Sequence, residues 1–180
     1  MGRIAKFVSE SKIFRINLLS MIFITLGTQN FNFSRLLKAV EAAINNGVLN
    51  EKVIAQIGNN KFESEQILCI PFLDKETFNQ YMDEAEFIIS HAGTGSIITA
   101  LKKVKKVLVA PRLKKYDEHI DDPQLEILGA FSKLNLIIPL KKDLSDLEDK
   151  IRNIEQYKLD SYKSNTHIFN KNLTELINSL

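Results

Sequence analysis

Short apolar runs alternate with longer segments of helical periodicity along most of the chain. The first run, 21–26, is rich in β-branched residues, and the segment 31–47 then repeats apolar residues at the spacing of a helix face. The same order recurs downstream. We expect strands at 21–26, 52–57, 67–72, 87–90, 106–110 and 136–139. We expect helices at 31–47, 74–83, 96–103, 143–157 and 160–180, and a further helix that begins at Pro123.

This alternation of strands and helices predicts a parallel sheet with helices on both faces, a Rossmann-like, doubly wound α/β fold. At 180 residues the chain is long enough for one domain with a full core, which we place at 21–180. Residues 1–20 form an N-terminal extension whose basic, amphipathic pattern predicts a helix. Such a helix could lie on a membrane, bind a partner or pack on its own domain, or the extension could precede a true start at Met21.

Composition and charge narrow the classes of function. Lys and Arg number 24 against 22 Asp and Glu, so the net charge of +2 gives no electrostatic case for nucleic acid. The single cysteine, Cys69, cannot form an internal disulfide, which favours the reducing cytoplasm. No apolar run approaches the roughly 18 residues of a membrane helix. A role at a membrane would therefore require a partner or a surface contact.

The most informative stretch is Phe87–Ile98, which reads Phe-Ile-Ile-Ser-His-Ala-Gly-Thr-Gly-Ser-Ile-Ile. It predicts a buried strand, a glycine turn and the start of a helix. A helix start carries unpaired N–H groups and a dipole that favours anions. Gly93 and Gly95 would let the backbone approach a ligand, while Thr94 and Ser96 could cap the helix or bind a phosphate. The spacing fits a phosphate or diphosphate site, and it equally fits a turn with no ligand.

Three loops should meet at the carboxyl edge of a parallel sheet, where ligands bind in this class of fold. They are Gly27-Thr28 after the first strand, 91–96 after the fourth and 112–124 after the fifth. The last loop carries many donors and acceptors suited to phosphate and sugar hydroxyl groups. By itself it would also fit a solvated charged loop.

Other chemistries have weaker support. Ser96, His91 and Asp121 could be imagined as a triad, but the serine lacks a Gly-x-Ser-x-Gly elbow. His91, His119, Asp121 and Asp122 do not follow a recognised metal-ligand spacing. The chain also lacks a Walker loop, a Gly-x-Gly-x-x-Gly fingerprint after the first strand and an Asp-x-Asp pair. We therefore expect no metal and no cofactor.

Three motifs together resemble a known family. They read Phe-Ile-Thr-Leu-Gly-Thr-Gln at 23–29, Ser-His-Ala-Gly-Thr-Gly-Ser at 90–96, and Ala-Pro-Arg with Glu-His-Ile-Asp-Asp-Pro-Gln-Leu-Glu within 110–126. The chain resembles the C-terminal, donor-binding half of MurG-type glycosyltransferases. It is most similar to the stand-alone bacterial PssE-type subunits and to the catalytic subunit of the eukaryotic dolichol-linked N-acetylglucosamine transferase. The resemblance runs from Met21 to the final helix and leaves 1–20 outside it.

The resemblance implies one half of a two-domain, inverting, metal-independent hexosyltransferase of polysaccharide synthesis. This half would hold a UDP-sugar donor, and a separate membrane-associated subunit would hold the lipid-linked saccharide acceptor. The chain would then be cytoplasmic and recruited by that partner to the inner face of the plasma membrane. The alternative is a non-catalytic accessory subunit that binds and activates such a partner. The sugar, the acceptor and the position of the general base stay open.

The resemblance also implies site residues. The 93–96 turn would hold the diphosphate, the turn after the first strand would line the cleft, and the 118–124 segment would approach the sugar. His91 or Arg112 would help to stabilise charge on the leaving UDP. The full set is Gly27, Thr28, His91, Gly93, Thr94, Gly95, Ser96, Thr99, Arg112, Glu118, His119, Asp121, Asp122 and Gln124. Two departures favour the accessory alternative: Thr99 stands where the family often has a ribose-binding Glu, and Pro123 where it often has His.

Overall fold

The computed structural model describes residues 20–164, so the helix predicted in the N-terminal extension, over residues 1–19, and the 165–180 part of the last predicted helix lie outside the described residues. The strands are β1 (Met21–Thr25), β2 (Lys52–Gln56), β3 (Ile67–Ile70), β4 (Phe87–His91), β5 (Lys106–Ala110) and β6 (Ile138–Pro139). The helices are α2 (Ser34–Asn45), α3 (Lys75–Glu84), α4 (Thr94–Lys102), α5 (Pro123–Lys133) and α6 (Leu147–Arg152), with 3-10 turns η1 (Lys114–Tyr116) and η2 (Ile154–Gln156). Within the described range, no helix combines the length and apolar character needed to cross a membrane.

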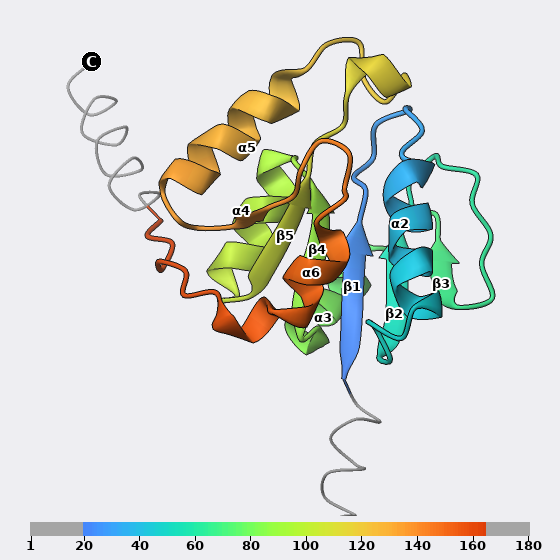
Figure 1. The fold of residues 1–180 in the computed structure, drawn as a ribbon, viewed down its shortest axis with the longest axis horizontal. Helices are drawn as coiled ribbons and strands as arrows, with labels where there is room; N and C mark the ends of the chain where they lie inside the picture. Colours follow the sequence, from blue (N-terminus) through green and yellow to red (C-terminus); the bar gives the residue numbers. More distant parts are fainter. Residues whose placement is uncertain (1–19, 165–180) are drawn as a thin grey trace, which may run out of the picture.

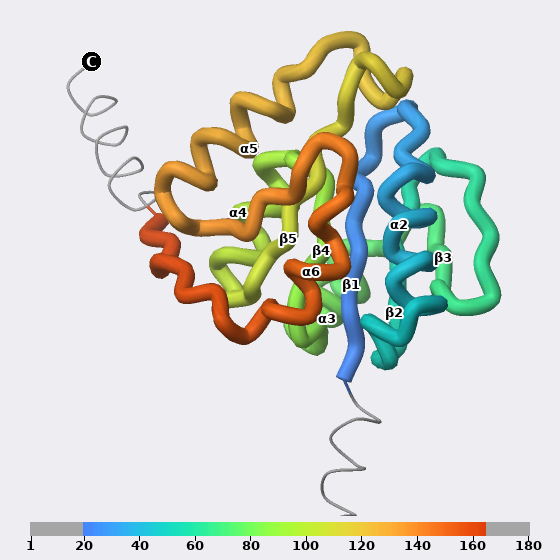
Figure 2. Tube along the Cα trace, viewed as in Figure 1, coloured from blue at the N-terminus to red at the C-terminus, as the bar shows by residue number. Residues whose placement is uncertain are grey.

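The strands form one parallel, six-stranded sheet in the order β3-β2-β1-β4-β5-β6 (Figure 1). The doubly wound class predicted from the sequence is therefore confirmed. The strand order reverses between β1 and β4, where Thr25 lies beside Ser90. This reversal is the topological switch point, outside which open α/β sheets bind their ligands. Figure 2 shows the turn after β1 and the 113–122 loop side by side at that edge, and an Arg112-to-Phe31 hydrogen bond joins them.

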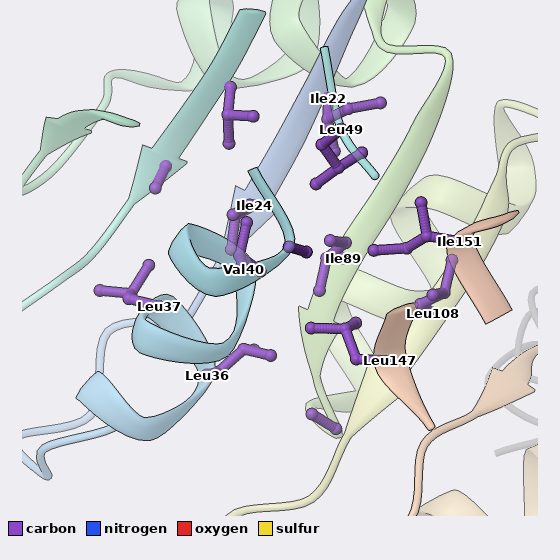
Figure 3. Packing of buried hydrophobic residues seen from close by; sticks show 14 of the residues in the cluster. Ile22, Ile24, Leu36, Leu37, Val40, Leu49, Ile89, Leu108, Leu147 and Ile151 are labelled. Carbon is purple, nitrogen blue, oxygen red and sulfur yellow. The ribbon is translucent and has the colours of Figure 1, made fainter. Parts of the chain in front are cut away.

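Helices cover both faces of the sheet and divide the core into two layers. Successive strand residues point to opposite faces, so Ile22 and Ile24 pack beneath α2 and α6 while Phe23 packs on the α3 side. Figure 3 shows the first layer through Ile22, Ile24, Leu36, Leu37, Val40, Leu49, Ile89, Leu108, Leu147 and Ile151. The second layer includes the edge-to-face ring pair of Phe23 and Phe78, whose centroids lie 5.4 Å apart. The loops at the carboxyl edge thus stand on a closely packed base.

The prediction of a helix at 143–157 is wrong for its first turn, and the helix that forms, α6, is shorter than predicted. Leu144 has a φ of +62°, and α6 begins only at Leu147. The carboxylate of Asp143 accepts from the Ser145 N–H at 3.1 Å, and that of Asp146 accepts from the Lys141 N–H at 2.9 Å. Short polar side chains that bind nearby backbone groups in this way compete with helix formation.

The prediction of a helix that begins at Asp160 is also wrong for residues 160–164, the part that the structure describes. Residues 160–164 have no helical structure. The Asp160 N–H donates to the Asn135 carbonyl at 2.9 Å, and the Asn135 amide donates to the Lys158 carbonyl at 3.1 Å. These hydrogen bonds attach residues 158–160 to Asn135, just after α5. The chain here passes along the end of α5 instead.

Candidate functional site

A cavity of about 720 Å³ opens at the carboxyl edge of the sheet, beside the switch point. Most of the predicted site residues line it, namely Gly27, Thr28, His91, Gly93, Thr94, Gly95, Ser96, Thr99, His119 and Gln124. They come from the turn after β1, from the end of β4 and the first turns of α4, and from the β5–α5 loop and the start of α5, which the parallel sheet predicted to converge. Four other predicted site residues, Arg112, Glu118, Asp121 and Asp122, do not line the cavity.

The start of α4 faces this cavity without a side-chain cap. The helix begins at Thr94, earlier than predicted, and Gly93 occupies the N-cap position. Neither Thr94 nor Ser96 caps it, so of their two predicted roles the cap is wrong and phosphate binding stays a prediction. Because the first N–H groups of a helix have no acceptor within the helix, an uncapped start offers donors and a positive dipole end to an anion.

His91, the last residue of β4, explains why Gly27 and Gly93 are glycines. A Cβ at Gly93 would lie 2.1 Å from the His91 Nε2 atom, and a Cβ at Gly27 would lie 2.7 Å from the same atom. Gly27 also has a φ of +73°, which favours glycine in its own right. At Gly95, by contrast, a Cβ would meet no atom within 4 Å. Gly93 therefore makes room for the imidazole ring, and Gly95 is the position that leaves space open to the cavity.

The His91 side chain is neutral and fixed in one tautomer. Its Nδ1 atom lies 3.3 Å from the Thr25 carbonyl, which can only accept, so Nδ1 carries the proton and Nε2 is an acceptor. Burial lowers the pKa of His91 to about 4, against the opposing hydrogen bond to Thr25 and with a further contribution from the Arg112 charge. At neutral pH the Nε2 atom thus cannot donate to a phosphate. The donor role expected of His91 requires that it first take up a proton.

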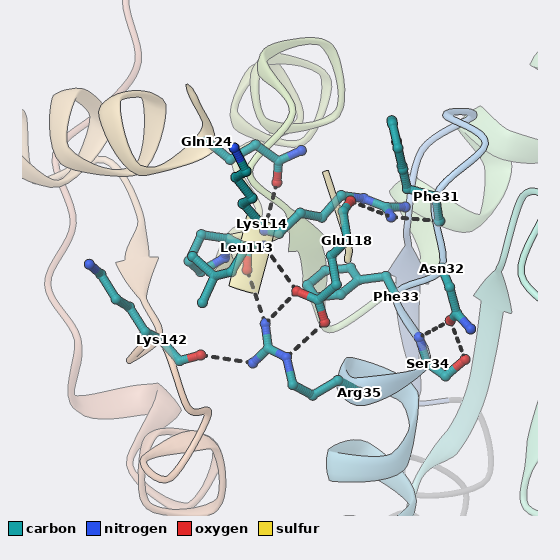
Figure 4. Close-up of polar contacts among 12 residues, drawn as sticks. Phe31, Asn32, Phe33, Ser34, Arg35, Leu113, Lys114, Glu118, Gln124 and Lys142 are labelled. Carbon is teal, nitrogen blue, oxygen red and sulfur yellow. Dashed lines mark hydrogen bonds and ion pairs between the residues drawn. The ribbon is translucent and has the colours of Figure 1, made fainter. Parts of the chain in front are cut away.

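Arg112 and Glu118 lie behind the wall of the cavity, which corrects their expected contact with the ligand. Arg112 is fully buried, and its guanidinium donates to backbone carbonyls. Glu118 is 2% exposed and accepts two hydrogen bonds from the Arg35 guanidinium, both at 2.8 Å. Figure 4 shows Arg35 between Glu118 and the Lys142 carbonyl, with Leu113 donating to Glu118. These side chains hold loops together, and neither of them lines the cavity where a sugar could contact it.

Asp121 and Asp122 shape the β5–α5 loop from outside the cavity. Asp122 accepts from the Lys114 N–H at 2.8 Å, and Asp121 pairs with the Nδ1 atom of His119 at 2.8 Å. The His119 ring also packs on Phe31, with 5.3 Å between the ring centroids. The expected contact of these two carboxylates with a sugar is therefore corrected: they support the loop and do not line the cavity. Of this group, only His119 reaches the cavity.

Sequence reasoning missed part of the cavity wall. Gln29, Gln56, Leu73, Lys75 and Phe78 also line it. Gln56 ends β2 and accepts from the Leu73 N–H at 3.1 Å, which joins the loops after β2 and β3. The rule that ligands bind beyond the carboxyl ends of strands could have found both loops. Within residues 20–164, no group of three or more His, Cys, Asp and Glu side chains is placed to hold a metal ion.

Known proteins similar to this chain support the fold and identify the family. The chain is 34% identical over 121 residues to the UDP-N-acetylglucosamine transferase subunit ALG13 of Candida albicans. The matched region covers 67% of this chain and 37% of that protein. It is 25% identical over 116 residues to the subunit of the same name from Debaryomyces hansenii, covering 63% and 54%. The chain thus spans about a third to a half of the length of these relatives.

A solved structure, the glycotransferase of kitacinnamycin, matches with a TM-score of 0.58 at 15% identity and covers 79% of this chain and 35% of its own. This match supports the Rossmann-like fold. The family model described as "Glycosyltransferase family 28 C-terminal domain" matches residues 21–180, nearly the whole chain. The chain therefore belongs to the family of glycosyltransferase family 28 C-terminal domains.

Proposed function

We propose that this chain is the donor-binding subunit of an inverting glycosyltransferase that needs no metal. It transfers a hexose-type sugar from a UDP-sugar to a lipid-linked acceptor, held by a separate membrane-associated subunit, in polysaccharide synthesis. The observation that carries the proposal is the uncapped start of α4, which faces a cavity at the switch point. The family and the relatives named as UDP-N-acetylglucosamine transferase subunits support the donor class.

The cavity offers complementary surfaces to the parts of a UDP-sugar. The first turn of α4 provides N–H donors for the diphosphate, and Lys75 adds a cation along the same wall. Leu73 and Phe78 add apolar surface for the base. Gln124 uses its Oε1 atom to accept from the Arg112 N–H at 2.9 Å, so its amide hydrogens are available to a sugar hydroxyl.

The transfer requires a charged leaving group to be stabilised. As the bond between the anomeric carbon and the UDP oxygen breaks, the electron pair stays on UDP and its negative charge grows. Oriented backbone N–H groups at the α4 start stabilise this charge without reorganising. The acceptor oxygen bonds to the opposite face of the anomeric carbon and gives its proton to a base. In our proposal the partner subunit supplies that base.

UDP should stabilise the isolated chain in the presence of a metal chelator. At a concentration about 100 times Kd, ligand binding adds about 2.7 kcal/mol to the free energy of unfolding, a rise of roughly 5 °C or more in Tm. Gly95→Trp should abolish the shift, because position 95 leaves open space at the cavity wall. Gly129→Trp is a matched control: position 129 is also open but does not line the cavity, so its shift should persist. Differential scanning fluorimetry measures both, and an unshifted Tm at millimolar UDP would contradict donor binding by this chain alone.

A second candidate function, the accessory subunit, is favoured by Thr99. Its hydroxyl donates to the Gly95 carbonyl at 2.8 Å, so it does not replace a ribose-binding carboxylate. Coexpression with the partner subunit separates the two functions. The donor-binding proposal predicts that Gly95→Trp reduces sugar transfer by the complex by about a hundredfold or more, because the cavity is filled. Transfer that survives this substitution, in a complex that still assembles, would support the accessory function.

A further inference from the structure

The Arg112 side chain holds both ends of one turn at the cavity. Its Nη2 atom donates to the Leu26 carbonyl at 2.8 Å, and its Nη1 atom donates to the Phe31 carbonyl at 2.7 Å. These two carbonyls enclose the turn 27–30, which brings Gly27, Thr28 and Gln29 to the cavity wall. One guanidinium therefore binds both ends of this turn, and between them the Asn59 amide donates to the Thr28 carbonyl at 3.3 Å.

Arg112 also belongs to the loop on the other side of the cavity. It follows β5 directly, and its backbone N–H donates to the Gln124 side chain at 2.9 Å. Its Nη1 atom lies 3.5 Å from the Glu118 carbonyl oxygen, and its guanidinium carbon lies 4.9 Å from the centre of the Phe33 ring. The residue thus links the β1–α2 and β5–α5 loops at a fixed separation.

Burying the Arg112 guanidinium costs free energy of folding, which calls for a role that offsets the cost. The Glu118 carboxylate is engaged by Arg35 and Leu113, and the Arg112 guanidinium instead binds carbonyl oxygens. The Arg112 Nε atom is buried and has no partner among the described residues. Burial lowers the pKa of Arg112 to about 10, although the nearby Glu118 opposes the change, so the group stays charged at neutral pH. A buried cation that is only partly compensated destabilises a fold, and an apolar side chain of similar volume often does not.

The 27–30 turn and the α4 start meet on the same ring. Gly27 and Gly93 both lie against His91, so a displaced turn would also disturb the helix start that faces the cavity. We propose that Arg112 is a positioning residue for the donor site. It holds the 27–30 turn against the α4 start and so determines affinity for the diphosphate without contacting it. This inference rests on the proposed function, because it concerns the same cavity.

Nuclear magnetic resonance of the unliganded full chain tests the positioning directly. In Arg112→Met the backbone order parameters of residues 27–30 should fall from about 0.85 to below about 0.6, while those of β2 stay unchanged. Arg112→Lys should give intermediate values, because one ammonium replaces the two-pronged guanidinium. Arg35→Met is the matched control. It removes the ion pair with Glu118 but keeps both hydrogen bonds from Arg112 to the carbonyls that enclose the turn, so the turn should stay rigid. An unchanged turn in Arg112→Met and Arg112→Lys would overturn the proposal.

Calorimetric titration with UDP and with uridine tests the consequence. Arg112→Met should lower the affinity for UDP by about tenfold or more and that for uridine by less than about twofold. A smaller fraction of folded protein would lower the apparent affinity for UDP and for uridine alike, so it would not produce this difference between the two ligands. Equal losses for both ligands, or full recovery of UDP affinity in Arg112→Lys while the turn stays mobile, would overturn the proposal in favour of a structural or a purely electrostatic role. If the unsubstituted chain does not bind UDP, the proposed function fails, and the order parameters alone decide whether Arg112 holds the turn. If Arg112→Met does not fold, the same comparisons made with Arg112→Lys decide.

Discussion

Gly93→Ala should destabilise the fold by about 3 kcal/mol, at the upper end of what overpacking usually costs. The new Cβ would lie 2.1 Å from the His91 Nε2 atom and under 3 Å from two neighbouring ring atoms. The His91 ring cannot move away, because Gly27 also lies against it and the ring's Nδ1 atom is hydrogen-bonded to the Thr25 carbonyl. Backbone strain does not contribute, since Gly93 has a φ of −98°. Urea unfolding measures the loss.

Gly95→Ala is the matched control for this prediction. It lies in the same turn, and its Cβ would meet nothing within 4 Å, so stability should change by less than about 1 kcal/mol, in the stabilising direction. A second background identifies the cause. In a His91→Ser protein the ring is absent, and Gly93→Ala should then cost less than about 1 kcal/mol. An equal cost in both backgrounds would show that something other than the imidazole demands glycine at 93.

The sheet and its order of elements could be predicted because parallel strands covered on both faces leave continuous apolar runs. The run Lys106–Ala110 forms β5 with the predicted bounds. Local chemistry was equally informative at two helix starts. Asp74, where a helix was predicted to begin, is the N-cap of α3 and accepts from the N–H groups of Glu76 and Thr77, and Pro123 begins α5 as predicted. In these cases the signal and its structural effect lie within a few residues of each other.

The roles of the polar residues were harder to predict, because a donor near a ligand cavity can serve either the ligand or the fold. Arg112 and Glu118 lie in the loop that the sequence indicated, yet neither lines the cavity. Their partners come from far along the chain: Leu26 is 86 positions from Arg112, and Arg35 is 83 positions from Glu118. Periodicity and motif spacing carry no information about such pairs. The same limit applies to Gly93, where the ring of His91 leaves no room for a Cβ, a requirement that motif spacing does not reveal.

The neutral, buried His91 predicts a loss of stability in mild acid. Its pKa falls from 6.5 to about 4 on folding, chiefly through burial. The unfolded chain therefore binds more protons than the folded chain between these values, and stability must decrease as the pH falls. The contribution is complete above about pH 6.5 and is lost progressively towards about pH 4. Between about pH 7.5 and pH 4.5 the loss from this one group should be about 2.5 kcal/mol.

His91→Asn isolates this contribution, because the Asn amide can donate to the Thr25 carbonyl in place of Nδ1 but does not titrate. Urea unfolding across this pH range should show a smaller loss in His91→Asn than in the unsubstituted chain, by about 2.5 kcal/mol. The carboxyl groups that also titrate below about pH 5 are the same in both proteins and cancel in the comparison. Parallel stability curves would mean that the imidazole protonates within the fold at little cost. The cavity wall beside Gly27 and Gly93 would then admit water or a counter-charge to His91, and the case for its neutral form would fall.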